Sequence, residues 1–264
     1  MLNLKQYKDS VVGTFVIIIA FCLVCSVLVS SAVVALGPFK EAALANDRQV
    51  SILRVSGIDA GEAVAQTYAD HIEAQLIDVE TGLLVPEMQD QADGYNFQSL
   101  SRKPDTSVAI PPEEDVAGIR MRAKYMPVYF VKDDEGTVTR IILPFYGAAL
   151  WSTAYGYVAL STDGNTILGL TFYSHGETPG LGGEIDNPRW QALWVDKKFD
   201  NENGEYAFVI KKNAAKEGDA ASYEVDSLSG ATLTTRGIDN AARYWFGNAY
   251  KPFLENVRKG EIIK

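Results

Sequence analysis

The chain contains few residues that bind metals or form disulfides. Its 264 residues include only two cysteines and two histidines. Structural zinc sites use about four Cys or His ligands, and iron–sulfur clusters usually use four cysteines. We therefore expect no metal centre and no disulfide scaffold.

Basic residues are also scarce relative to acidic ones. The 24 Lys and Arg residues face 34 Asp and Glu residues, for a formal net charge of −10 at pH 7. Binding to a nucleic-acid backbone requires clustered Lys and Arg. The composition therefore predicts no nucleic-acid partner.

Charged residues are absent from Val11 to Leu36, and this stretch is dominated by Val, Ile, Leu, Phe and Ala. It exceeds the ~20 residues that cross a bilayer and the ~7 to 15 apolar residues of a signal peptide. We therefore expect an uncleaved transmembrane helix in contact with membrane lipid. Lys5 and Lys8 precede it, which favours a cytoplasmic segment at residues 1–10. The rest of the chain would then lie outside the cytoplasm.

The remaining sequence predicts three segments. Residues 37–125 are expected to be helical up to about residue 80 and irregular from 81 to 115, where Pro and Gly recur. Residues 126–250 carry alternating and β-branched runs and form the main domain. Residues 251–264 are expected as a C-terminal tail, with one or two further helical turns at 252–257.

Within residues 126–250 the strands pair in sequence order. The pattern predicts two hairpins, 128–131 with 138–143 and 155–160 with 167–173. It also predicts two short strands, 206–210 and 223–225, and a final helix at 235–246. Hairpin-linked strands with helices grouped at both ends are typical of an α+β fold with an antiparallel sheet and flanking helices.

Two segments have compositions that packing does not easily explain. Ser174 to Glu184 contains four glycines and a proline directly after an expected strand, so its backbone can approach a ligand closely. Its simpler interpretation is a tight turn. Asp226 to Thr235 is rich in hydroxyls just before the final helix, where backbone N–H groups bind phosphate. Its simpler interpretation is a Ser/Thr helix cap.

The second segment carries a specific resemblance. Asp226-Ser227-Leu228-Ser229-Gly230-Ala231-Thr232 resembles the flavinylation motif, in which a flavin transferase esterifies the final threonine with the phosphate of FMN. The whole chain resembles the NqrC family, the covalent-FMN subunits of the Na+-translocating NADH:quinone oxidoreductases. Further matching blocks are 103–108, 131–136, 141–144, 150–153, 175–184 and 186–190. One departure is Ala149 before Leu150-Trp151, where the family usually has glycine.

The resemblance implies the site residues. Thr232 would carry FMN through a covalent phosphoester, within the motif formed by Ser229, Gly230 and Ala231. Glu177, Thr178, Gly180 and Leu181 would line the isoalloxazine or the phosphate, and Trp151 would lie beside the ring. Asp226 would serve the modification reaction, or it would form an Asx turn.

The implied function is that of an electron-relay subunit, which passes electrons from NADH toward ubiquinone coupled to Na+ export. One span cannot build an ion path, so the chain would be one part of a translocase whose other membrane subunits oxidise NADH and transport sodium. The expected location is the bacterial inner membrane, with a periplasmic main domain and no resident metal.

Three alternatives stay open. The first is the covalent-FMN subunit of the ferredoxin:NAD oxidoreductase, which shares the motif. The second is an anchored hydrolase that uses Ser229 or Thr232 as nucleophile and His71 or His175 as base. The third is a cofactor-free interaction domain.

Overall fold

The computed structural model describes residues 10–263, apart from the side chain of residue 41, and separates into two compact units, Met1–Asn46 and Asp47–Lys264. Residues 1–9, which make up most of the expected cytoplasmic segment, lie outside the described residues. Each unit is described here by itself.

Helix α2 (Val11–Ser56) contains the expected membrane span. It is the one helix among residues 10–263 that is long and apolar enough to cross a membrane, with a mean hydropathy of 2.9 over its most apolar 18 residues. The helix does not end near residue 36, because it continues through Gly37 and Pro38 to Ser56. Its last turns bury Ile52, Leu53 and Val55 in the second unit, and this packing stabilises the extension.

The second unit is built on an antiparallel sheet with the order β1-β4-β5-β6-β7. Its strands are β1 (Ile72–Asp78), β4 (Tyr125–Lys132), β5 (Val138–Ala148), β6 (Thr153–Ser161) and β7 (Ile167–Ser174). The expected hairpins are β4 with β5 and β6 with β7, and β5 also pairs with β6. The structure thus confirms the α+β fold with an antiparallel sheet and flanking helices.

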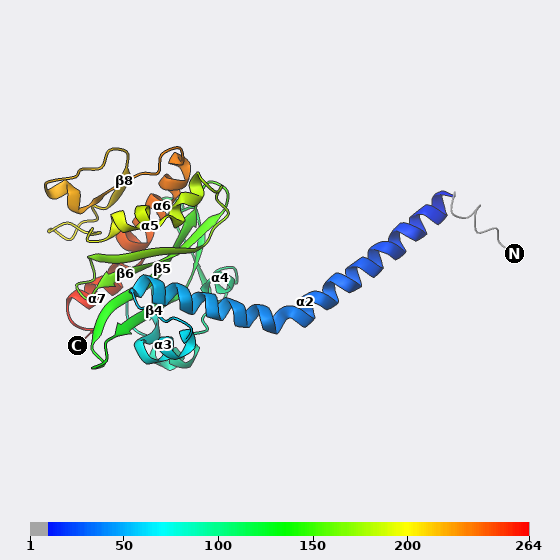
Figure 1. Ribbon diagram of the computed structural model, residues 1–264, viewed down its shortest axis with the longest axis horizontal. Coiled ribbons are helices and arrows are strands. Elements are labelled where there is room, and N and C mark those ends of the chain that lie inside the picture. The colour runs from blue at the N-terminus through cyan, green and yellow to red at the C-terminus, as the bar shows by residue number, and fades with distance from the viewer. Residues whose placement is uncertain (1–9, 264) are drawn as a thin grey trace. The chain divides into compact units, whose positions relative to one another are not determined.

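Both faces of the sheet are covered. Figure 1 shows α6 (Thr232–Tyr244) on one face and α3 (Val64–His71) on the other. The α6 face holds the larger core, to which α7 (Lys251–Arg258) and the π-helical turn η5 (Trp245–Ala249) also contribute. The opposite core joins the end of α2 to tyrosines such as Tyr129 and Tyr157. Because both faces are covered, the central strands are buried along most of their length.

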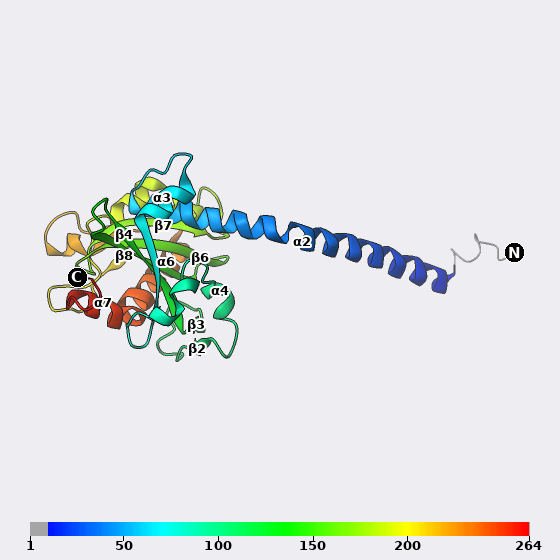
Figure 2. The same cartoon turned by 90° about the horizontal axis from the view of Figure 1, so that it is seen from below.

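The smaller elements lie at the margins of the sheet. Figure 2 shows the two-stranded ladder of β2 (Ser107–Ala109) and β3 (Met121–Ala123) near α4 (Phe97–Leu100). The other short elements are η1 (Pro86–Gln91), η2 (Gly182–Asp186), α5 (Pro188–Gln191), η3 (Ala192–Trp194), β8 (Val209–Lys211), η4 (Asp219–Ser222) and β9 (Glu224–Asp226). Strands β8 and β9 form a parallel pair, an exception in an otherwise antiparallel protein.

Some expectations for single elements were wrong. Residues 72–78 were expected to be helical, but they form the edge strand β1, because pairing with β4 outweighs a weak helical pattern. The last helix begins at Thr232 rather than at residue 235. The further helical turns expected at 252–257 are confirmed as α7, which buries Phe253, Leu254 and Val257 in the main core.

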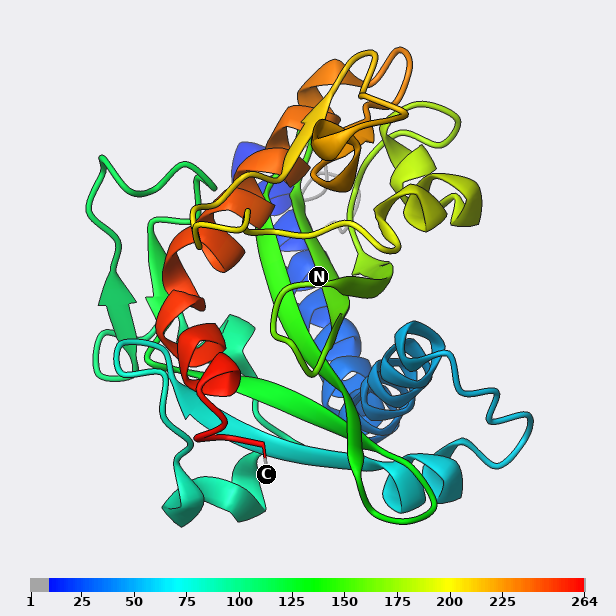
Figure 3. The ribbon, with the colours of Figure 1, turned by 90° about the vertical axis from the view of Figure 1, so that its left-hand side faces the viewer.

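Glycines bring α6 against the end of β5, and this contact positions the candidate site. A Cβ on Gly147 would lie 2.7 Å from Cβ of Ala241, and one on Gly237 would overlap the carbonyl oxygen of Ala148. Side chains at either position would therefore force the two backbones apart. Figure 3 shows α6 crossing over the sheet, with its first turn at the end where β5 leads into the next turn.

Candidate functional site

The first turn of α6 is not capped by a side chain. Thr232 is the first helical residue, and the preceding residue Ala231 is the N-cap with no side-chain hydrogen bond. The hydroxyl-rich segment is therefore not a Ser/Thr cap. Backbone N–H groups in the first turn have no intrahelical acceptor, and they carry the partial positive charge of the helix end. An anionic group placed at Thr232 meets these donors.

The hydroxyls of this segment differ sharply in accessibility. Thr232 and Ser229 are exposed, whereas Thr234 and Thr235 are 0% and 2% exposed. The Thr234 hydroxyl donates to the Glu177 carboxylate, and the Thr235 hydroxyl donates to the carbonyl of Ala231 at 2.9 Å. Helical geometry and burial thus leave Thr232 as the accessible hydroxyl of the first turn.

The turn that leads into α6 depends on Gly230. Its φ of +78° lies in the left-handed region that favours glycine. A Cβ there would lie 3.6 Å from Cδ2 of Leu181, which is ordinary contact distance. Gly230 is therefore required for its backbone conformation, and Leu181 lies beside the turn that presents Thr232.

Asp226 at the end of β9 does not form an Asx turn. Its carboxylate accepts a hydrogen bond from the backbone N–H of Ala214 at 2.8 Å and pairs with the Lys216 ammonium. The hydrogen bond from Lys216 and that from Ala214 hold the pKa of Asp226 below its usual range. The ionised carboxylate therefore ties residues 214–216 to the strand that leads to the flavinylation motif.

A cleft of about 510 Å³ opens beside the start of α6. Among the described residues, its lining includes the basic side chains Lys211, Lys212 and Arg236. The hydroxyls of Ser229 and Thr232 line it as well. Asp226 and Asp239 also line the cleft, and Lys211 pairs with Glu224. Lys212 and Arg236 beside an uncapped helix N-terminus fit a phosphate monoester. The sequence analysis missed these basic residues. Lys211 and Lys212 lie about 20 residues before Thr232, and nothing in the local sequence showed that Arg236, one helical turn after Thr232, faces the same cleft.

The Gly-rich loop forms its own tight turn. The carbonyl of Thr178 accepts from the N–H groups of Leu181 at 3.1 Å and Gly183 at 2.9 Å, and Gly180 has a φ of +75°. Thr178, Gly180 and Leu181 are exposed. The loop thus presents an apolar side chain, Leu181, beside Gly230, as a flat aromatic ligand requires.

Trp151 lies in the turn between β5 and β6 and is 70% exposed. Its backbone N–H donates to Oε1 of Glu177 at 2.8 Å. An indole this exposed on a turn held by a buried side chain offers a face for stacking. Glu177 itself is 5% exposed, so it lies beneath the surface that Trp151 presents.

Neither histidine contacts the hydroxyls that a hydrolase would use as its nucleophile. In His175, Nδ1 accepts from the N–H of Glu177 at 3.1 Å, and Nε2 lies 2.8 Å from Oδ2 of Asp186. His71 at the end of α3 contacts the carbonyl of Lys132 through Nδ1. Neither contact joins a histidine to Ser229 or Thr232, so the arrangement does not resemble a hydrolase triad.

The structure therefore brings the expected residues together as two adjoining groups. Ser229, Gly230, Ala231 and Thr232 form the turn at the uncapped helix, and Trp151, Thr178, Gly180 and Leu181 form an exposed rim beside it. Glu177 differs from the exposed rim residues because it is buried. Together these groups fit a ligand with a phosphate at one end and a flat aromatic ring at the other.

Comparison with known proteins gives the same ligand class. The FMN-binding domain family matches residues 150–247. The NqrC protein of the Na(+)-translocating NADH-quinone reductase of Haemophilus ducreyi is 45% identical over 96% of this chain and 97% of its own length. The corresponding protein of Vibrio alginolyticus is 43% identical over 97% of this chain and 98% of its own length.

A solved structure shows the same similarity in three dimensions. The crystal structure of NqrC from Shewanella oneidensis superimposes with a TM-score of 0.76 and 33% sequence identity, and the match covers 83% of this chain and 99% of that chain. The FMN-binding match includes both groups of the candidate site, from the Trp151 turn to the first turns of α6.

Proposed function

The chain belongs to the NqrC family of the Na(+)-translocating NADH-quinone reductases, and we propose that it carries FMN as a phosphoester on Thr232 and relays electrons within that complex. FMN bound there supplies one-electron transfer. The observation that carries the proposal is the exposed Thr232 hydroxyl at an uncapped helix N-terminus, beside a cleft lined by Lys211, Lys212 and Arg236.

The chain's own residues hold and shield the cofactor in this proposal. The unpaired N–H groups of α6 and the basic side chains compensate the charge of the phosphoester. Leu181 and the exposed indole of Trp151 cover part of the ring and reduce its contact with water. Thr178 and Gly180 shape the loop that carries Leu181. The covalent bond prevents loss of the cofactor from an exposed site.

Partners follow from the family. The relatives are named as subunits of a Na(+)-translocating NADH-quinone reductase, so other membrane subunits assemble with this chain to oxidise NADH, reduce ubiquinone and move sodium. The relatives' names favour this complex over the ferredoxin:NAD oxidoreductase. A flavin transferase forms the phosphoester during maturation, and Asp226 supports it by ordering the segment before the motif.

The proposed location is the bacterial inner membrane. The apolar part of α2 anchors the chain in lipid, the first residues lie in the cytoplasm, and the main domain lies in the periplasm. Lys5 and Lys8 before the apolar run support this orientation.

Peptide mapping of the chain purified from its native host tests the attachment. Cleavage after Lys216 and Arg236 releases a Glu217 to Arg236 peptide, which we expect to be heavier by FMN less one water, with the added mass on Thr232. Thr232→Val produced beside the transferase loses the added mass. Ser229→Ala is the matched control, because Ser229 is the other exposed hydroxyl of the motif, and it keeps the mass. An unmodified native peptide, or a modified Thr232→Val peptide, would refute the proposal.

A further inference from the structure

Three segments that are distant in sequence converge on the carboxylate of Glu177. Its Oε1 accepts the backbone N–H of Trp151, from the turn between β5 and β6, at 2.8 Å. Its Oε2 accepts the hydroxyl of Thr234, from the first turn of α6, at 2.5 Å. The third segment is the Gly-rich loop that carries Glu177 itself. One side chain therefore joins the exposed rim of the site to the helix that bears Thr232.

Burial of the Glu177 carboxylate is unfavourable, because the group loses its contact with water. Glu177 is 5% exposed, and no Lys, Arg or His side chain of the described residues pairs with its carboxylate. A buried carboxylate without a cation is unfavourable, and its hydrogen bonds compensate only part of that energy. The partial positive charge at the start of α6 compensates a further part.

Packing around the carboxylate leaves no space for a larger neighbour. A Cβ on Gly182 would lie 2.5 Å from Oγ1 of Thr234 and 2.7 Å from Oε2 of Glu177. The hydrogen bond between Thr234 and Glu177 therefore requires glycine at position 182. The Gly-rich loop, the Trp151 turn and the first turn of α6 therefore pack closely around the carboxylate of Glu177.

We propose that Glu177 is a positioning residue, which fixes the Trp151 turn and the first turn of α6 so that the indole and the Thr232 hydroxyl meet the same ligand. It acts through Trp151 and Thr234, and its carboxylate lies beneath the ligand surface instead of lining the ring. This inference rests on the proposed function for the identity of the ligand, while its geometry is independent of FMN.

Amide hydrogen exchange in the full-length chain, made without the transferase, tests the geometry before any cofactor is attached. Glu177→Ala removes the acceptor of the Trp151 N–H, and loss of a hydrogen bond to a charged group accelerates exchange of that amide by about tenfold or more. Glu177→Gln keeps a carbonyl oxygen that accepts the same N–H and restores most of the protection. Glu184→Ala is the control, because Glu184 lies in the same loop but bonds to Asn187 instead of the helix. Unchanged exchange of Trp151 in Glu177→Ala would overturn the inference.

A second variant keeps the test decisive if Glu177→Ala does not fold. Thr234→Val preserves the side-chain volume and removes only the hydroxyl that Oε2 accepts. We expect faster exchange of the Thr235 N–H, which bonds to the carbonyl of Ala231 in the same turn, whereas Thr234→Ser keeps the wild-type rate. Equal exchange in Thr234→Val and Thr234→Ser would contradict a link through the hydroxyl.

The loaded protein gives a separate readout. In chains carrying FMN on Thr232, Glu177→Ala shifts the visible circular dichroism of the flavin, and Glu177→Gln recovers the wild-type spectrum, because only the former releases the Trp151 turn. An unchanged spectrum in Glu177→Ala would contradict the inference although FMN is attached. Absence of FMN from the wild-type peptide would instead refute the proposed function and leave the exchange results intact.

Discussion

Gly237 of α6 lies directly against Ala148 at the end of β5, so that a Cβ on Gly237 would overlap the Ala148 carbonyl oxygen and lie 2.8 Å from Cα of Ala149. No side chain fits between these two backbones. The contact sets the distance between the helix that bears Thr232 and the turn that bears Trp151.

Gly237→Ala tests this contact. The added methyl group meets backbone atoms that cannot rotate away, so we expect the free energy of unfolding to fall by about 1 to 3 kcal/mol, as in overpacked cores. Urea denaturation measures the change. Gly94→Ala is the control, since a Cβ there meets nothing within 4 Å, and it should stay within about 0.5 kcal/mol of wild type. Equal stability of the two variants would show that α6 and β5 separate without cost.

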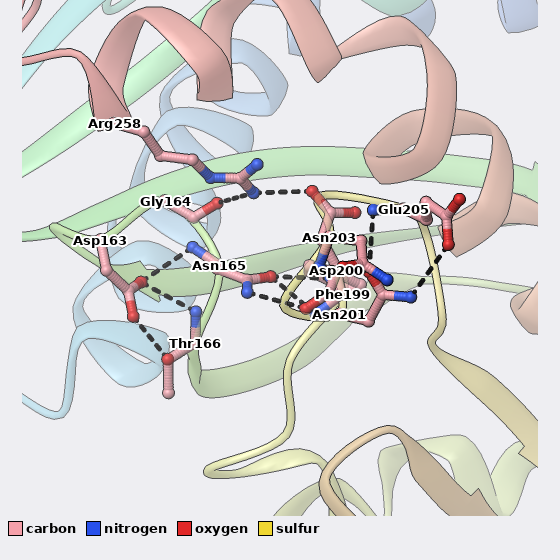
Figure 4. Close-up of polar contacts among 10 residues, drawn as sticks. All are labelled: Asp163, Gly164, Asn165, Thr166, Phe199, Asp200, Asn201, Asn203, Glu205 and Arg258. Atoms are coloured by element: carbon pink, nitrogen blue, oxygen red, sulfur yellow. Dashed lines mark hydrogen bonds and ion pairs between the residues drawn. The ribbon is translucent and has the colours of Figure 1, made fainter. Parts of the chain in front are cut away.

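Arg258 joins α7 to Asp200 and to the turn between β6 and β7, through a side chain that is itself partly exposed (Figure 4). Nη2 of Arg258 lies 2.8 Å from Oδ2 of Asp200 and donates to the carbonyl of Gly164 at 3.0 Å. Asn165 joins the same region, because its side chain bonds to the N–H and the carbonyl of Asp200. Asp200 is buried, and Arg258 is the basic side chain that pairs with its carboxylate.

Arg258→Ala should therefore destabilise the domain by about 1 to 3 kcal/mol, because it removes the partner of the buried Asp200 carboxylate. Thermal and urea unfolding of the purified protein measure the effect. Lys132→Ala, which removes the more exposed ion pair with Glu73, should cost no more than about 1 kcal/mol. A loss below that of Lys132→Ala would contradict the role assigned to Arg258.

The carboxylate of Asp239 on α6 predicts a pH dependence. Burial raises its pKa, and the hydrogen bond from the Ile210 N–H at 2.7 Å only partly offsets this. A pKa that is higher in the folded state means that the folded chain binds more protons at Asp239. The resulting contribution to the free energy of unfolding is fully present below the unfolded pKa and is lost as the pH rises through the folded pKa.

Asp239→Asn keeps an oxygen that accepts the Ile210 N–H and removes the buried charge. We expect the variant to be at least as stable as wild type at pH 7, with its advantage shrinking as the pH falls toward about 4, the unfolded pKa of aspartate. Unfolding curves at several pH values measure this. An advantage that grows at acid pH would show that the sign is wrong.

The last turns of α2 belong to the folded domain. Ile52, Leu53 and Val55 are buried beside Tyr129 and Tyr157, whereas residues 1–46 form a separate unit. A chain that begins at Asp47 should therefore fold and unfold cooperatively in solution, while one that begins at Ile58 should lose several kcal/mol because three apolar side chains are missing from the core. Circular dichroism melting of both truncations decides this, and equal melting temperatures would contradict the packing.

Much of the fold follows from local patterns. The alternating runs predict the strands of both hairpins, since a strand with two packed faces selects β-branched and aromatic residues over short distances. The pattern fails at residues 72–78, where cross-strand pairing with β4 decides between helix and strand. It correctly predicts helix between residue 40 and Ser56, but it does not predict that this stretch continues the apolar helix through Gly37 and Pro38.

The sequence by itself determined the two segments at the centre of the candidate site, because the motif that ends at Thr232 and the Gly-rich loop are contiguous stretches with a distinctive composition. It did not reveal the basic residues Lys211, Lys212 and Arg236 that line the cleft. Only the tertiary structure decided which of these residues face solvent and which are buried. It exposes Thr232, buries Thr234 and places Glu177 beneath Trp151. These distinctions arise from contacts between β5, the Gly-rich loop and α6, and contacts between distant segments depend on the packing of the whole domain instead of on any local run of residues.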